Sequence, residues 1–128
     1  MGIFGAHASV FLVVVSILTI LFAAPIAFAP LSWARVFRWE IPERTDLAVY
    51  FGRCLGMVVT ALAVMALVAA RQPAVQPFFF MTIFVVVGGN VVVHVFGAVR
   101  RIQPRSETIE IAVWLALFAA AILFYPRR

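Results

Sequence analysis

Five polar residues lie within or beside strongly apolar stretches of this chain, and three of them can exchange a proton or bind a metal ion. The five are Arg53, Asn90, His94, Glu107 and Glu110. Histidine and carboxylates can exchange protons or ligate a metal, and arginine can pair with a carboxylate. Ionisable residues inside membrane-spanning segments are costly, and they often mark ion or substrate pathways. These five residues are the predicted polar cluster, and the fold of the apolar stretches decides whether it forms.

The composition predicts that the chain lies in a membrane. Of its 128 residues, 66% are hydrophobic and 12% are charged, against about 45–50% and about 25% in an ordinary soluble domain. Such hydrophobicity excludes intrinsic disorder and exceeds what so small a soluble domain could bury. Ten arginines, no lysine and five acidic residues give a net charge of +5. The arginines cluster between apolar runs, which is typical of membrane-flanking charge and not of nucleic-acid binding.

Four apolar segments are long enough to cross a bilayer as helices. They cover residues 8–29, 47–70, 78–99 and 107–125, and about 20 residues suffice to cross a hydrocarbon core of about 30 Å. The connections between them are rich in Arg and Pro, as helix ends are expected to be. We predict an all-α fold in which residues 1–128 form one transmembrane domain, an antiparallel polytopic four-helix bundle.

The distribution of arginines predicts the orientation of the bundle. The first and third loops carry six arginines on one side, and the other side carries three. Because positive residues collect in the cytoplasm, we expect both termini to lie outside it. The stretch Ala27-Phe28-Ala29 has the pattern of a signal-peptide cleavage site, but no Arg or Lys precedes it. That absence favours a first helix that is retained.

The first loop contains a short amphipathic segment, residues 31–39, which we predict to be an interfacial helix. Its anchoring residues are Trp33, Phe37, Trp39, Arg35 and Arg38. The aromatic side chains would face the acyl chains, and the arginines would face the lipid phosphates. Recognition of a specific anionic lipid is an alternative, but aromatic belts of this kind are general to membrane proteins. A membrane anchor is therefore the favoured interpretation.

Small residues in the second segment predict a tightly packed helix interface. Gly52 and Gly56 form a G-x-x-x-G pattern, which lets another helix approach closely. The pattern leaves open whether that helix belongs to the same chain or to a second copy. The expected partners are therefore membrane lipid and either a homo-oligomer or a larger membrane complex.

The topology brings the predicted polar cluster to the cytoplasmic half of the bundle. Arg53 lies about 10 Å from that end, and His94 and Asn90 lie about 8 and 14 Å from it, at 1.5 Å per helical residue. Glu107 and Glu110 fall in the first turn of the last helix. We predict that Arg53 pairs with one of these glutamates, because an unpaired arginine at this depth costs several kcal/mol.

Simpler structural roles are open for the same residues. Acidic residues in a first helical turn favour the helix dipole, and Ser106 is placed to cap that helix. For His94 the simplest role is a hydrogen bond across the bundle. Arg53 could also extend to the membrane surface, since its side chain is long enough.

Scattered features resemble the DoxX-like group and related small bacterial four-helix membrane proteins. These features are an Ala-Pro exit from the first helix, Tyr50-Phe51-Gly52-Arg53-Cys54-Leu55-Gly56 at the start of the second, and Glu107-Thr108-Ile109-Glu110 at the start of the fourth. The resemblance spans most of the chain and implies a four-helix bundle in a bacterial inner (plasma) membrane. Members of the group have been linked to membrane redox systems and quinones, but no quinone-site motif transfers that role to particular residues of this chain.

The sequence favours a protein that is not an enzyme. It contains no nucleophile–base pair, no phosphate-binding glycine loop and no zinc-site spacing, and its single cysteine excludes an intrachain disulfide. We expect an accessory or assembly subunit of a membrane complex, or a homo-oligomer. One alternative is a proton-coupled transporter that uses Arg53, His94 and Glu110. Another is a redox subunit that binds quinone or haem near His94 and Trp114; the residues by themselves identify neither a cofactor nor a metal.

Overall fold

The computed structural model describes residues 3–126, with side chains from residue 7 onward. This part of the chain is all-helical. The helices are α1 (Ile3–Phe28), α2 (Pro30–Val36), α3 (Asp46–Ala70), α4 (Gln76–Arg100) and α5 (Arg105–Leu123). Four of them are long and apolar enough to span a membrane, and the short α2 lies in the first loop. The predicted all-α class with four spanning helices is confirmed.

Helix ends follow the local chemistry of the chain. Proline occupies the first turn of α4, where a missing N–H costs no helical hydrogen bond. The same helix stops at Arg101, whose φ of 55° is left-handed, a conformation common just after helix ends. Pro104 then holds an extended conformation with ψ of 161° before α5 begins. The resulting tight turn returns α5 alongside α4.

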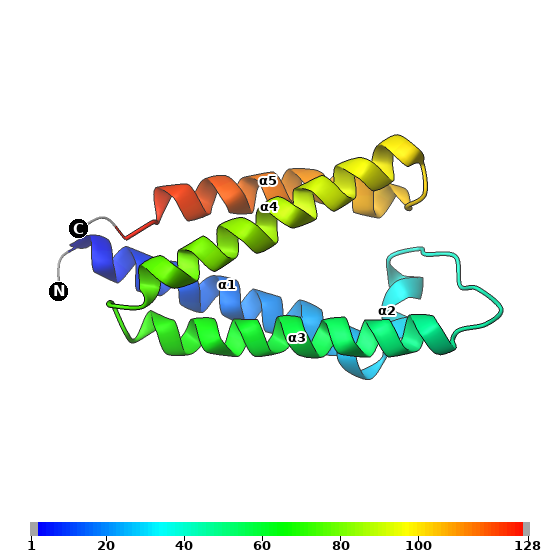
Figure 1. Cartoon of the computed structure of the whole chain (residues 1–128), viewed down its shortest axis with the longest axis horizontal. Coiled ribbons are helices and arrows are strands. Elements are labelled where there is room, and N and C mark those ends of the chain that lie inside the picture. Colours follow the sequence, from blue (N-terminus) through cyan, green and yellow to red (C-terminus); the bar gives the residue numbers. More distant parts are fainter. Residues whose placement is uncertain (1–2, 127–128) are drawn as a thin grey trace.

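The long helices form two pairs (Figure 1). α1 packs along α3 and α4 packs along α5, whereas α3 and α4 share little contact. The pairs converge at the end where α1 begins and α5 finishes, and they diverge toward the end that holds α2. The bundle is therefore open at one end and closed at the other.

A buried core joins all four long helices at the closed end. It consists of Ala8, Phe11, Leu12, Ala66, Ala69, Ala70, Phe80 and Ala121. The ring of Phe11 stacks on that of Phe80 with centroids 5.3 Å apart. Beside it, the buried Gln76 donates from Nε2 to Ser9 Oγ at 2.9 Å. Small alanines let the backbones approach and the aromatic rings fill the remaining space, so this end is the fixed point of the fold.

The G-x-x-x-G pattern packs within the chain. A Cβ built on Gly56 would lie 2.7 Å from Ala27 Cα and 2.9 Å from Ala23 O. A Cβ built on Gly52 would lie 2.7 Å from Pro30 Cβ. These separations are too short for a real methyl group, so both glycines allow α3 to pack directly on α1 and on the start of α2. The partner that the pattern predicts is therefore a helix of the same chain.

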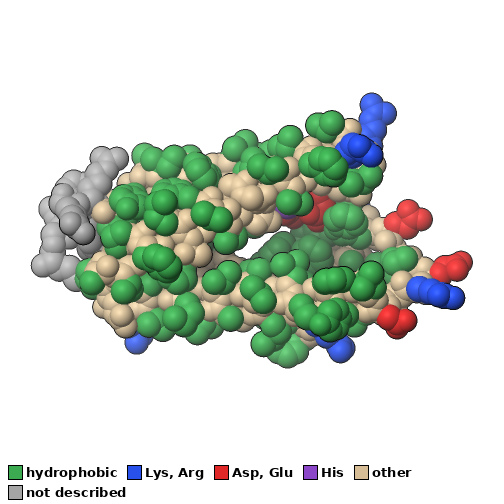
Figure 2. Space-filling model, viewed as in Figure 1, with side chains coloured by type: hydrophobic (Ala, Val, Ile, Leu, Met, Phe, Trp, Pro, Cys, Tyr) green, Lys and Arg blue, Asp and Glu red, His purple; other side chains and the backbone are tan. Residues whose placement is uncertain are grey.

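At the open end a gap separates the two helix pairs (Figure 2). Two side-chain hydrogen bonds in the described part of the chain connect the segment after α2 to the start of α5. Trp39 Nε1 donates to Glu107 Oε1 at 3.0 Å, and Ser106 Oγ donates to the carbonyl of Phe37 at 2.7 Å. Contact between the pairs at this end thus rests on a few polar groups, in contrast to the apolar core at the other end.

Replacing Gly56 by alanine is expected to destabilise the protein by about 1–3 kcal/mol, the usual cost of overpacking. The new methyl would meet the backbone of α1, which cannot move aside as a flexible side chain can. Gly89→Ala is the matched control, because a Cβ at Gly89 in α4 meets nothing within 4 Å. Thermal unfolding in detergent, followed by circular dichroism, compares the two variants. Equal melting temperatures for both would contradict this account of Gly56.

Candidate functional site

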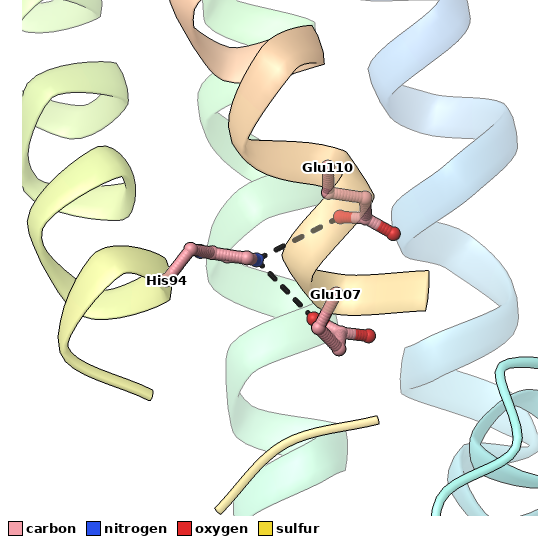
Figure 3. A group of neighbouring side chains, drawn as sticks. All are labelled: His94, Glu107 and Glu110. Carbon is pink, nitrogen blue, oxygen red and sulfur yellow. Dashed lines mark ion pairs between the residues drawn. The ribbon is translucent and has the colours of Figure 1, made fainter. Parts of the chain in front are cut away.

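The turn between α4 and α5 brings His94 against the first turns of α5 (Figure 3). His94 Nε2 lies 3.2 Å from Glu107 Oε2 and 3.7 Å from Glu110 Oε2. One nitrogen or oxygen atom from each of the three residues lies within 4.8 Å of the others. His94 and Glu107 are buried, with exposed fractions of 8% and 7%. We call these three residues the His–Glu site.

Gln103 fixes the turn that assembles the His–Glu site. Its Nε2 donates to the His94 carbonyl at 3.0 Å and to Thr108 Oγ1 at 3.2 Å. Its side chain lies directly against Gly97, where any Cβ would clash with it. A glycine one turn after His94 therefore lets the glutamine bridge α4 and α5. Sequence reasoning missed Gln103, because nothing in a short polar loop distinguishes a bridging glutamine from a solvated one.

Hydrogen bonding fixes the orientation and the tautomer of the His94 ring. Its Nδ1 lies 2.8 Å from the carbonyl oxygen of Asn90. A carbonyl only accepts, so Nδ1 carries the proton and donates it. In the neutral ring Nε2 is then an acceptor, and Trp114 Nε1 donates to it at 3.3 Å. The lone pair of Nε2 therefore faces the two carboxylates.

This arrangement lacks positive charge. Two carboxylates and an imidazole lone pair converge on one point, and no arginine among the described residues forms an ion pair with either glutamate. Burying unpaired carboxylates is strongly unfavourable. A proton on Nε2 would convert the ring to an imidazolium that donates to Glu107, at the expense of the Trp114 hydrogen bond. A bound metal ion would supply charge in the same place, so the His–Glu site suits a proton or a metal ion.

The predicted pairing of Arg53 with a glutamate is wrong. Arg53 is exposed on α3, and the ion pairs of both glutamates within residues 3–126 are with His94. The reason is the divergence of the helix pairs: α3 and α5 are apart at this level (Figure 1), so a shared depth does not produce contact. An exposed arginine near a helix end can extend to the lipid headgroups.

Two other predicted roles also change. The side chain of Asn90 donates to Val86 O at 2.8 Å within α4, so Asn90 contributes to the His–Glu site only through its backbone carbonyl. Ser106 lies inside α5, whose N-cap is Pro104, and its hydroxyl donates to Phe37 O as described above. Of the predicted polar cluster, His94 and the two glutamates come together.

The aromatic residues of the first loop pack mainly against protein. The ring of Trp33 lies 4.5 Å from that of Phe37, and both contact Phe22 of α1 edge-on, at 5.4 and 5.5 Å. Trp39 reaches the other helix pair through Glu107. The two loop arginines, Arg35 and Arg38, are exposed. Trp39 therefore belongs to the surroundings of the His–Glu site, a role that the anchor prediction did not include.

Comparisons of this chain with family models, with curated proteins and with solved structures found no match. The resemblance to DoxX-like proteins therefore stays a prediction. Function must be inferred from the fold and from the His–Glu site.

Trp39 and Glu107 are expected to be energetically coupled. In a double-mutant cycle with Trp39→Phe and Glu107→Ala, unfolding free energies measured in detergent should deviate from additivity by about 0.5–3 kcal/mol, as for directly bonded groups. Trp33→Phe is the control partner, because Trp33 Nε1 makes no hydrogen bond with the described residues. Full additivity for the Trp39 cycle would show that this hydrogen bond contributes nothing.

Arg53 and Glu110 are expected to act independently. Arg53→Ala and Glu110→Ala should add to within about 0.3–0.5 kcal/mol, as for residues that share no partner. His94→Ala and Glu110→Ala should depart from additivity, because the two side chains face each other at 3.7 Å. Unfolding free energies of the singles and doubles test both statements. Coupling of Arg53 with Glu110 would restore the pair that the sequence predicted.

Proposed function

We propose that this protein is a small membrane carrier that takes up and releases a cation, in the simplest case a proton, at the His–Glu site. The observation that carries the proposal is the convergence of His94, Glu107 and Glu110, with no compensating arginine among the residues that the structure describes. Figure 2 supports it, since acidic and histidine side chains are visible at the edge of the gap between the helix pairs. Buried ionisable groups beside a gap in a membrane bundle favour an ion pathway.

The position of Glu107 supports a link between cation uptake and movement. One carboxylate oxygen of Glu107 accepts from Trp39, and the other faces His94. A change in the charge of this carboxylate therefore alters one of the two hydrogen bonds that connect the helix pairs at the open end. Such coupling of a charge change to a contact between two halves is what a carrier requires.

One argument for the alternative role of an accessory subunit, the G-x-x-x-G pattern, no longer holds. Gly52 and Gly56 face α1 and α2, so they no longer argue for a second chain. We still propose a homodimer, because four helices enclose too little space for a complete pathway. The arginine asymmetry of the loops supports a membrane orientation with the termini outside the cytoplasm, and the family resemblance supports a bacterial inner membrane.

The redox alternative receives less support from the geometry. His94 Nε2 already faces two carboxylates and Trp114. The second histidine, His7, lies near the start of α1, at the opposite end of the bundle. A haem held between paired histidines would need both near one level. We therefore propose no haem.

Proton flux into liposomes tests the proposed function. The purified protein, reconstituted with a trapped pH-sensitive dye and a clamped membrane potential, should acidify the lumen faster than empty liposomes. Glu110→Gln and His94→Gln should reduce the rate to that of empty liposomes, because they remove groups that bind the proton. Glu43→Gln, at an exposed glutamate of the first loop, is the matched control and should retain the flux. Flux that survives both site substitutions would refute the proposal.

A further inference from the structure

Two of the three distances between ligand atoms in the His–Glu site are close to those of a metal site, and all three atoms lie within 4.8 Å of one another. A tetrahedral ion with bonds of about 2.0–2.2 Å places its ligand atoms about 3.3–3.6 Å apart. His94 Nε2 lies 3.2 Å from Glu107 Oε2 and 3.7 Å from Glu110 Oε2. Small side-chain movements would complete the geometry. We propose that the His–Glu site binds one divalent transition-metal ion of the zinc class. This proposal names the cation of the proposed carrier, and it rests on the proposed function where transport of that ion is concerned.

Neighbouring groups already select the ligand atoms. The Asn90 carbonyl accepts a hydrogen bond from Nδ1–H of His94, so Nε2 is the ring nitrogen that can bind a metal ion. Metal-bound histidines in proteins almost always have such an outer partner. Trp39 Nε1 occupies Oε1 of Glu107, which leaves Oε2 toward His94. Two of the three ligands are thus oriented before any ion arrives.

Charge balance favours a divalent ion over a proton. Two ionised carboxylates carry a charge of −2, and an imidazole that binds a metal ion through Nε2 is neutral. A divalent ion brings the His–Glu site to zero, whereas a single proton leaves −1. In surroundings as apolar as this bundle, the uncompensated charge is costly. Full neutralisation by one ion would remove that cost.

The donor set indicates the class of metal. One imidazole nitrogen and two carboxylate oxygens suit Zn²⁺, Mn²⁺ or Fe²⁺, whereas Ca²⁺ and Mg²⁺ favour oxygen alone and Cu⁺ favours sulfur. Cys54, the single cysteine, is exposed on α3 and outside the site. Three protein ligands leave a fourth position open, as an ion that binds and leaves requires.

The hydrogen bond from Trp114 to His94 must break when the ion binds. Its Nε1 donates to the His94 Nε2 lone pair at 3.3 Å, and one lone pair cannot serve a proton donor and a metal together. Metal binding therefore releases this hydrogen bond and brings a metal ion beside an indole ring. Trp114 is a built-in reporter of occupancy, since paramagnetic Co²⁺ quenches nearby tryptophan fluorescence.

Titration of the purified full-length protein in detergent with Zn²⁺ and with Co²⁺ tests the proposal. Calorimetry should give one Zn²⁺ per chain. Co²⁺ should quench the tryptophan fluorescence, and it should quench less in Trp114→Phe, where only Trp39 remains beside the site. Glu110→Gln and His94→Gln should each weaken binding at least about 100-fold, beyond the 10–100-fold typical of outer partners. Glu43→Gln, at an exposed glutamate of the first loop, is the matched control and should retain the affinity. Affinity should also fall with acidification, since protons compete for the ligands.

Different failures identify different errors. Zinc affinity unchanged in both His94→Gln and Glu110→Gln, with melting curves that show folded protein, would overturn the metal site. Proton flux in liposomes without any zinc binding would also overturn it and would leave the proposed carrier intact. Zinc binding that depends on His94, with neither zinc nor proton flux, would uphold the site and refute the carrier.

Discussion

The carboxylate of Glu107 carries the contact on which the open end of the molecule depends. Its two oxygens face different segments: Trp39, after α2, and His94, in α4. A single buried charge thereby joins the first loop, the fourth helix and the fifth. Because a buried carboxylate is tolerated only with partners, each contact supports the other. The His–Glu site and the junction of the two helix pairs therefore share the same residue, Glu107.

The two ends of the bundle are held together by different interactions. At the closed end, alanines and stacked phenylalanines hold all four long helices by close packing. At the open end, the pairs meet through hydrogen bonds from Trp39 to the Glu107 carboxylate and from Ser106 to the Phe37 carbonyl. Packing contacts are insensitive to protonation and metal, whereas hydrogen bonds to a carboxylate respond to both. The fold therefore places the carboxylate contact between the helix pairs at the open end.

Hydrophobic length was enough to predict the four spanning helices, since the bilayer thickness sets the number of residues each needs. The meeting of His94 with Glu107 and Glu110 was also predictable, because a short turn joins their helices. Arg53 was misplaced because depth in a membrane says nothing about distance across it, and the helix pairs diverge at that level. Trp39 was missed because its partner lies 68 residues away, beyond the reach of any local pattern.

Because the helix pairs are joined at the closed end, a small tilt of one pair about that end produces a larger movement at the open end. The 25 residues of α4 extend about 37 Å at 1.5 Å per residue. By that length, a tilt of about 5° around the alanine-rich core moves the far end by about 3 Å. That displacement is comparable to the whole length of the hydrogen bond between Trp39 and Glu107, 3.0 Å. Helix tilt responds to bilayer thickness, so a change of tilt about the closed end would alter the geometry around Glu107.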